Sequence, residues 1–151
     1  MKVGKASMSS DLKKILSWCA KRSISVTFSN TAENYRDGSE IVISGRMSER
    51  RKVVYLLHEC GHWLIDSKKE CKRFGTGYPS QHLSRVNKTF SYRSSVVFEE
   101  LEAWKRGWDL GKRLKVRVTK EFFENQKSKA LKLYFEWALA PKKFEKEDEE
   151  E

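Results

Sequence analysis

The spacing of hydrophobic and polar residues predicts a chain of helices with two short strands. Apolar residues recur every three or four positions in residues 11–21, 95–114 and 119–140, a period that is typical of amphipathic helices. Residues 24–28 alternate apolar and polar side chains, and residues 40–44 form a short apolar run closed by a glycine. We predict that these two segments are strands that pair in a small sheet. The predicted class is α+β, with residues 1–140 as a single domain.

Residues 48–66 predict a further helix, and it differs from the others. Ser48 is a suitable N-cap residue, and from Val53 to Ile65 the residues are apolar apart from one short polar motif. A helix that is apolar on all sides is a buried helix. The segment that follows, residues 67–94, is long, basic and rich in glycine and serine. We expect it to be a loop that flanks or covers a cleft.

The polar motif in the buried helix has the spacing of a metal site. His58 and His62 are four residues apart and therefore lie on one face of the helix, where two imidazoles can bind one Zn²⁺ ion. Glu59, the second residue of the H-E-x-x-H pattern, points to a neighbouring face and can act as a general base towards a water molecule. The alternative is that both histidines are hydrogen-bonded residues of the core.

A catalytic zinc ion usually has three protein ligands, so the two histidines need a third partner. One source is the acidic run in residues 98–104, which contains Glu99, Glu100 and Glu102 beside apolar residues. Another is His82, in the basic segment. A closed site made of His58, His62, His82 and Glu100 would instead indicate a structural zinc protein without turnover.

The motif and the acidic run together resemble a known group, the gluzincins, and within them the ImmA/IrrE-type metallopeptidases of phages and bacteria. In that group H-E-x-x-H is followed by a helix that carries E-x-x-A, as in Glu100-Leu101-Glu102-Ala103. The resemblance implies a minimal zincin-like domain with endopeptidase activity, in which Glu100 binds the zinc and the small Ala103 lets the two helices approach. It also implies that residues 41–43 form an edge strand along which an extended protein or peptide substrate lies.

The chain departs from related families at several positions. In thermolysin-like gluzincins, an acid four residues after the ligand glutamate orients a histidine, but this chain has Trp104 at that position. The remaining candidates for this orienting role are Glu99, Glu102 and Asp66. SprT-like, DNA-associated proteases use a third histidine, which His82 would supply, although it is followed by Leu83 rather than glycine. Metzincins are excluded because their glycine and third histidine are replaced by Ile65 and Lys68.

Candidates for the residue that stabilises the oxyanion are Tyr78, His82 and Tyr92.

Composition adds a prediction about the compartment. The 151-residue sequence has no apolar run long enough to span a membrane, and its first residues lack the apolar region of a signal peptide. Its three cysteines, Cys19, Cys60 and Cys71, do not form a C-x-x-C pair. These features predict free thiols in a cytoplasmic protein.

The net charge of the chain predicts a further kind of partner. The formal net charge is +10, although residues 141–151 are mostly acidic and are predicted to be disordered. Without the six acids and one lysine of residues 145–151, the rest of the chain carries about +15. Such a charge attracts polyanions. A nucleic acid is therefore a predicted partner, through the basic residues Lys68, Lys69, Lys72, Arg73 and Arg85.

Overall fold

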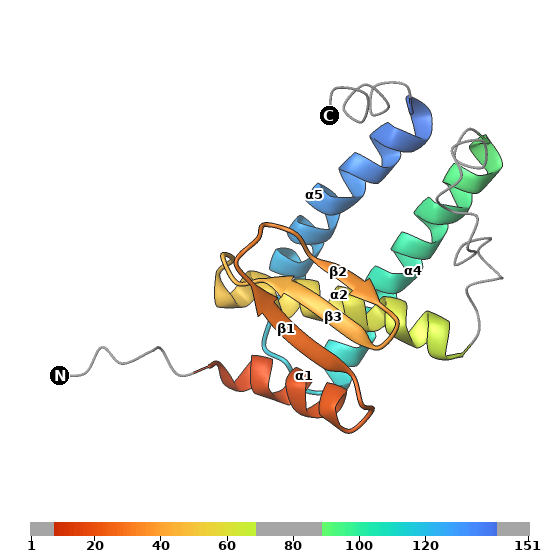
Figure 1. Ribbon diagram of the computed structural model, residues 1–151. Coiled ribbons are helices and arrows are strands. Elements are labelled where there is room, and N and C mark those ends of the chain that lie inside the picture. Colours follow the sequence, from red (N-terminus) through yellow and green to blue (C-terminus); the bar gives the residue numbers. More distant parts are fainter. Residues whose placement is uncertain (1–7, 69–88, 142–151) are drawn as a thin grey trace.

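The computed structural model describes residues 8–68 and 89–141, and within these ranges it shows four helices and one three-stranded sheet (Figure 1). The elements in chain order are α1 (Ser10–Ala20), β1 (Ser25–Ser29), β2 (Tyr35–Asp37), β3 (Glu40–Ser44), α2 (Glu49–Ser67), α4 (Phe90–Arg113) and α5 (Lys120–Leu139). The predicted α+β class is confirmed, and so are the three helices expected near residues 11–21, 48–66 and 119–140.

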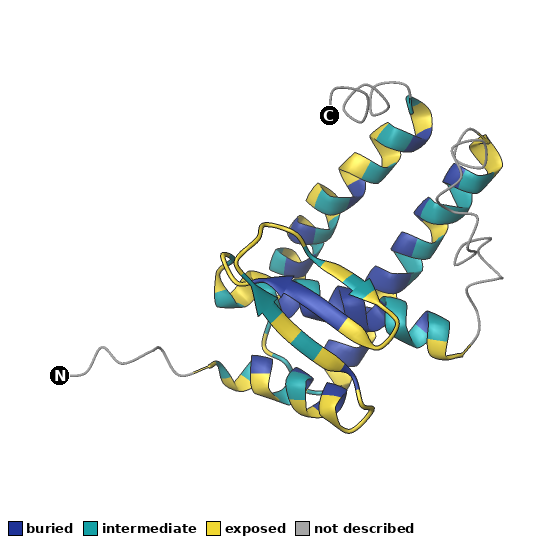
Figure 2. Ribbon diagram, viewed as in Figure 1, coloured by how far each residue is buried: buried dark blue, intermediate teal, exposed yellow. Residues whose placement is uncertain are grey.

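Helix α2 is the centre of the fold. It packs against the sheet through β3 and against α1, α4 and α5 (Figure 1). Figure 2 shows that the buried positions gather on α2 and on the parts of its neighbours that face it. Val54, Leu56 and Cys60 are completely inaccessible to solvent, as a helix that is apolar on all sides requires. The helix begins where the sequence predicted, because the Ser48 side chain accepts a hydrogen bond from the Arg51 backbone N–H.

The sheet has the strand order β1-β3-β2, with β1 parallel and β2 antiparallel to β3. The expectation that residues 41–43 form an edge strand is therefore wrong. Strand β2, which is not one of the two predicted strands, pairs with the side of β3 that would otherwise be free. Gly38 has φ +58° and makes the tight turn between β2 and β3. The edge strand on this side of the sheet is thus β2.

Helices α2 and α4 approach each other unusually closely through glycines. A Cβ atom at Gly61 would overlap the backbone oxygen of Ala103, and one at Gly107 would lie 2.6 Å from the backbone oxygen of Leu57. Ala103 itself is completely buried. Its expected role in letting the two helices approach agrees with this packing, but the opposing glycine of the motif and Gly107 matter as much.

Helix α4 begins at Phe90, earlier than the predicted start at residue 95. Thr89 caps it by accepting a hydrogen bond from the Tyr92 backbone N–H. The early turn is held by Arg93, which is buried and donates from Nε to the Ala138 backbone oxygen of α5. This long-range contact explains why a polar stretch, assigned to the basic loop from its composition, is helical. Most of that segment, residues 69–88, lies outside the described residues.

Two of the three cysteines are described. Cys19 and Cys60 are free and buried, with their sulfur atoms 3.6 Å apart, so they join α1 to α2. The predictions for Cys71 and for the acidic tail lie outside the described residues, apart from Pro141. In the described part of the chain, none of the helices combines the length and the apolarity that a membrane span needs. The cytoplasmic location stays a prediction.

Candidate metal centre

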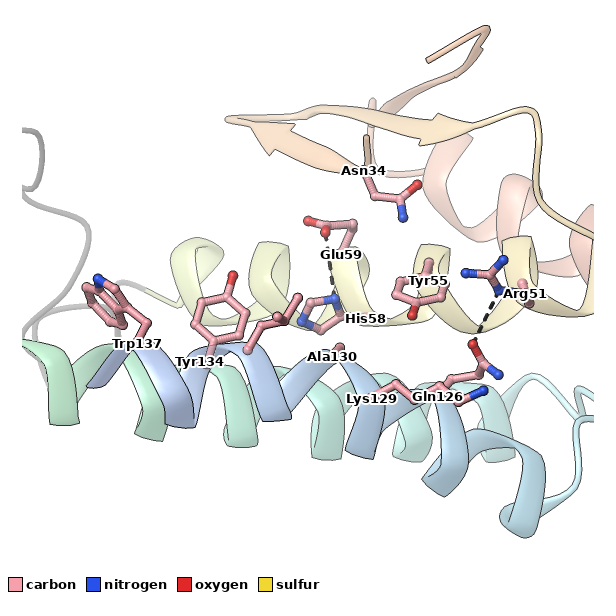
Figure 3. Close-up of a pocket in the computed structure, with 11 residues that line it drawn as sticks. Asn34, Arg51, Tyr55, His58, Glu59, Gln126, Lys129, Ala130, Tyr134 and Trp137 are labelled. Carbon is pink, nitrogen blue, oxygen red and sulfur yellow. Dashed lines mark hydrogen bonds and ion pairs between the residues drawn. The ribbon is translucent and has the colours of Figure 1, made fainter. Parts of the chain in front are cut away.

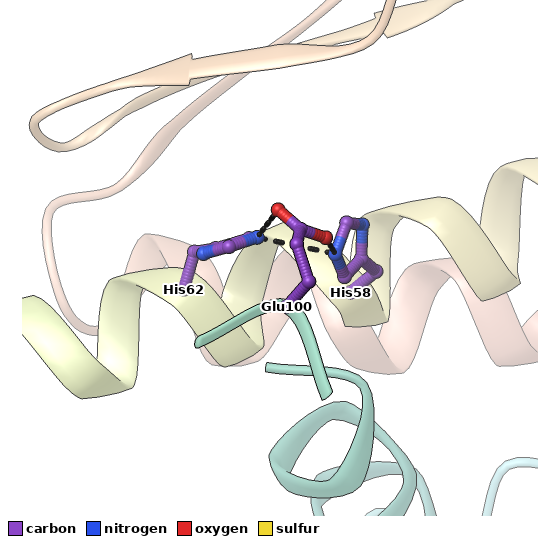
Figure 4. Close-up of side chains that lie close together, drawn as sticks. All are labelled: His58, His62 and Glu100. Carbon is purple, nitrogen blue, oxygen red and sulfur yellow. Dashed lines mark hydrogen bonds and ion pairs between the residues drawn. The ribbon is translucent and has the colours of Figure 1, made fainter. Parts of the chain in front are cut away.

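Three side chains from two helices converge on one point (Figure 4). His58 and His62 project from successive turns of α2, and Glu100 reaches them from α4. The two Nε2 atoms are 3.1 Å apart, and each lies 2.9 Å from a different carboxylate oxygen of Glu100. This buried cluster could hold a metal ion. Among the candidates for the third ligand that the structure describes (Glu99, Glu100 and Glu102), Glu100 is the one that joins both histidines.

The spacing of these donor atoms fits a metal ion. Donors at about 2.0–2.1 Å from a tetrahedral ion are about 3.3 Å from one another. The observed separations of 2.9–3.1 Å are close to that value. His58 and Glu100 are 7% and 6% exposed, so the packing that surrounds them holds the side chains in these positions. Two imidazole nitrogens and one carboxylate oxygen form a ligand set that divalent transition metals favour.

The charges in the cluster stabilise one another. Burial is the largest influence on His62 and favours its neutral form, but the Glu100 charge and hydrogen bonds to Glu100 and Glu99 outweigh it and raise the pKa of His62 to about 10. Burial also opposes ionisation of Glu100, yet the two histidines outweigh it and hold the pKa of this carboxyl well below its usual range. Glu100 is therefore an anion, as a metal ligand must be.

The groups around the histidines differ from the thermolysin arrangement. Of the three acids considered for orienting a histidine, Glu99 fits, because its Oε1 lies 3.5 Å from Nδ1 of His62. Glu102 instead pairs with Arg106, and Asp66 pairs with Arg36. Trp104 stacks on the His58 ring with centroids 4.2 Å apart and planes 13° from parallel. The tryptophan thus fixes the orientation of His58 by packing, where thermolysin-like enzymes use a charge.

Glu59 lies beside the three donors and not among them. Its Oε1 is 3.7 Å from Nδ1 of His58, whereas Glu100 contacts Nε2 of the same ring. Glu59 and His58 line two neighbouring hollows. The larger is a groove of about 800 Å³. The smaller has a volume of about 370 Å³ and is also lined by His62 and Glu100. The donor cluster therefore faces space that a ligand can enter. A carboxylate next to the donors at the wall of a cavity has the placement that a general base requires.

The structure adds two residues that the sequence did not single out. Tyr134 of α5 and Asn34, just before β2, line both hollows. Burial, together with the Glu100 and Glu59 charges, raises the pKa of Tyr134 well above its usual value, so its hydroxyl keeps its proton. No local pattern marks Tyr134, because its position depends on how α5 packs.

Of the three residues first considered as oxyanion donors, Tyr92 lines the smaller hollow, while Tyr78 and His82 lie outside the described residues. The alternative of a closed four-ligand site with His82 is therefore not addressed by the described residues. Among the basic residues predicted to attract nucleic acid, Lys68 is described, and Lys69, Lys72, Arg73 and Arg85 are not. Lys68 borders a hollow together with both cations and acids, so nucleic-acid binding stays a prediction.

Comparisons of the chain with protein-family models, with curated proteins and with solved structures gave no significant match. The resemblance to gluzincins therefore depends on the residues of the two helices alone.

Proposed function

We propose that this protein is a zinc-dependent endopeptidase whose zinc ligands are His58, His62 and Glu100. One observation carries the proposal: two histidines of an H-E-x-x-H helix and a carboxylate of a second helix converge in a buried cluster, and Glu59 lines the cavity beside them. Catalytic zinc sites have three protein ligands and an open position, whereas structural sites are closed by four. Three described donors that face a cavity favour the catalytic kind.

The residues around the cluster have roles that follow from their positions. A zinc ion bound there supplies Lewis acidity, which polarises a carbonyl group and acidifies water. Glu59 takes a proton from the attacking water and passes it to the leaving amine, so that one water molecule converts the peptide bond to a carboxylic acid and an amine. Glu99 and Trp104 keep the histidine rings in place.

Strand β2 offers a place for the peptide. It is one of the two edge strands of the described sheet, and Tyr35 and Arg36 line the smaller hollow beside His58 and Glu59. An extended peptide can pair with an exposed strand edge through backbone hydrogen bonds. The role that the family resemblance implied for residues 41–43 thus passes to residues 35–37.

Tyr134 is suited to stabilise the oxyanion, because its protonated hydroxyl lies at the cavity beside Glu59 and Glu100. We expect Tyr134→Phe to lower kcat by about 10²-fold with little change in KM, since one oxyanion donor is removed. Steady-state kinetics on one peptide, with metal content measured in parallel, tests this. Tyr92→Phe is the matched control at the same hollow, and an equal loss in both variants would contradict the assignment.

The proposal as a whole is tested by metal content and hydrolysis together. The wild-type chain should bind about one zinc ion and cleave unfolded protein, and a chelator should remove both properties until zinc is restored. Glu100→Ala should lose the metal and the activity. Glu102→Ala is the matched control on the same helix, since Glu102 pairs with Arg106 away from the histidines, and it should keep both.

Three other results would each contradict a part of the proposal. Stoichiometric zinc without hydrolysis of any unfolded protein would contradict the endopeptidase and favour a structural zinc domain. Zinc retained by Glu100→Ala would contradict the ligand assignment and direct attention to His82 or to another carboxylate. Wild-type protein without affinity for divalent metals would mean that the two histidines are core residues.

A further inference from the structure

The larger hollow is a groove that continues from the metal centre along α2 and α5 (Figure 3). His58 and Glu59 lie in its middle part, and Tyr134 and Trp137 lie towards one end. Lys129, Gln126 and Arg51 lie towards the other end. The volume of about 800 Å³ is within the usual range for sites that bind small ligands or peptide segments. The groove has more room than water and the reacting groups need.

Apolar side chains line the groove beside His58 and Glu59. Tyr55 and Ala130 border it close to His58, and Leu133 lines it while leaving 60% of its own surface exposed. Tyr55 is held in place by an edge-to-face contact with Trp104, the ring that also stacks on His58. A bulky apolar side chain of a peptide would cover these surfaces, and their removal from water favours its binding.

The Arg51 end of the groove is positive. The Nε atom of Arg51 donates to Oε1 of Gln126, a residue that is 5% exposed, so a buried anchor holds the guanidinium group at the groove. Lys129 of α5 lines the groove towards the same end. In the described part of the chain, neither cation has an ion-pair partner, and Glu59 is the one acid that lines the groove. A carboxylate that enters this end of the groove from solvent would meet two cations that no described acid pairs with.

The distance from the positive end of the groove to Glu59 sets the length of the motif. Arg51 and Glu59 are eight positions apart on α2, which corresponds to about 12 Å at 1.5 Å per residue. An extended peptide covers this distance in about three to four residues. We propose that the groove selects peptides that have a bulky apolar residue beside the cleaved bond and an acidic residue three to four positions away. The inference rests on the proposed peptidase function, since it names the substrate class for that site.

The test measures binding separately from cleavage. Two fluorescent peptides share a central phenylalanine and differ in having two glutamates or two lysines at the third and fourth positions from it. They are titrated against the zinc-loaded Glu59→Gln protein, which should bind peptides without cutting them. The acidic peptide should bind at least about tenfold more tightly, with a smaller difference at high salt. Peptides that carry the charges on the opposite side of the phenylalanine show which direction of the chain the groove accepts.

Charge reversal assigns the preference to the groove. Lys129→Glu in the Glu59→Gln protein should lower the affinity for the acidic peptide by about tenfold and raise the affinity for the basic peptide. Lys132→Glu is the matched control, because Lys132 is on the same helix, pairs with Glu136 and does not line the groove. It makes the same change in net charge and should leave the ratio of the two affinities nearly unchanged.

The outcomes separate this inference from the proposed function. Any of three results would overturn the proposed selectivity. The two peptides could bind with equal affinity, neither could bind measurably, or Lys129→Glu and Lys132→Glu could change the affinities equally. If the groove shows the expected preference but wild-type protein with zinc leaves the acidic peptide intact, the groove inference stands as a binding site and the endopeptidase proposal fails. Cleavage of both peptides at the same kcat/KM would sustain the endopeptidase and overturn the selectivity.

Discussion

Replacing Glu59 with glutamine should lower the rate of peptide hydrolysis by about 10²–10⁴-fold, which is the usual contribution of a general base. Glutamine has nearly the same shape but cannot accept the proton of the attacking water. The metal should remain bound, because Glu59 lies beside the three donors and is not one of them. Peptide hydrolysis under saturating zinc, with metal content measured on the same samples, is the decisive measurement.

The control for this variant is another carboxylate changed in the same way. Glu102→Gln removes a negative charge from α4, where Glu102 pairs with Arg106, and should leave hydrolysis close to that of the wild type. An unchanged rate in Glu59→Gln would show that this carboxylate is not the base. A variant that loses the metal as well would show that Glu59 acts as a ligand.

The second large effect concerns stability. Gly61→Ala should destabilise the fold by about 3 kcal/mol or more, since the added methyl group overlaps the backbone oxygen of Ala103 and forces α2 and α4 apart. Backbone atoms of two packed helices cannot move aside as a side chain can. The shift would also move Glu100 away from the histidines. Urea unfolding of the metal-free proteins measures the loss without a contribution from bound metal.

Gly111→Ala is the matched control on the same interface. There the added methyl group would meet Cδ1 of Leu57 at 3.0 Å, and this flexible side chain can rotate. The higher helix propensity of alanine, worth about 1 kcal/mol, offsets the adjustment, so stability should change little. If Gly61→Ala unfolds at the same urea concentration as Gly111→Ala, the close approach of the two helices is not essential.

The sequence predicted the parts of the structure that depend on local patterns. The apolar run and the Ser48 cap located α2 to within a residue or two, because both signals lie within the segment that they describe. Glu100 was selected from three neighbouring acids through the E-x-x-A pattern, and the structure brings it to both histidines. The same signal located Ala103, which packs where α2 and α4 are closest.

The errors concern features that depend on distant contacts. Strand β2 is three residues long and is defined by its pairing with β3, so the local pattern did not predict it. The first turn of α4 is stabilised by Arg93 bonding to α5, which a local pattern does not contain. Tyr134 lies at the site because of how α5 docks. Each of these contacts joins residues that only the assembled fold brings together.

The division of the ligands between α2 and α4 has a consequence for how the protein is made. Residues 58 and 62 leave the ribosome well before residue 100, so a growing chain that ends within or soon after α2 contains both histidines but no complete site. With the proposed ligands, strong metal binding would begin when α4 has been synthesised and has packed against Gly61. From then on, a bound ion would favour the docked arrangement of the two helices over any state in which α4 is detached. Metal acquisition would in this way be restricted to chains that have already folded around the motif helix.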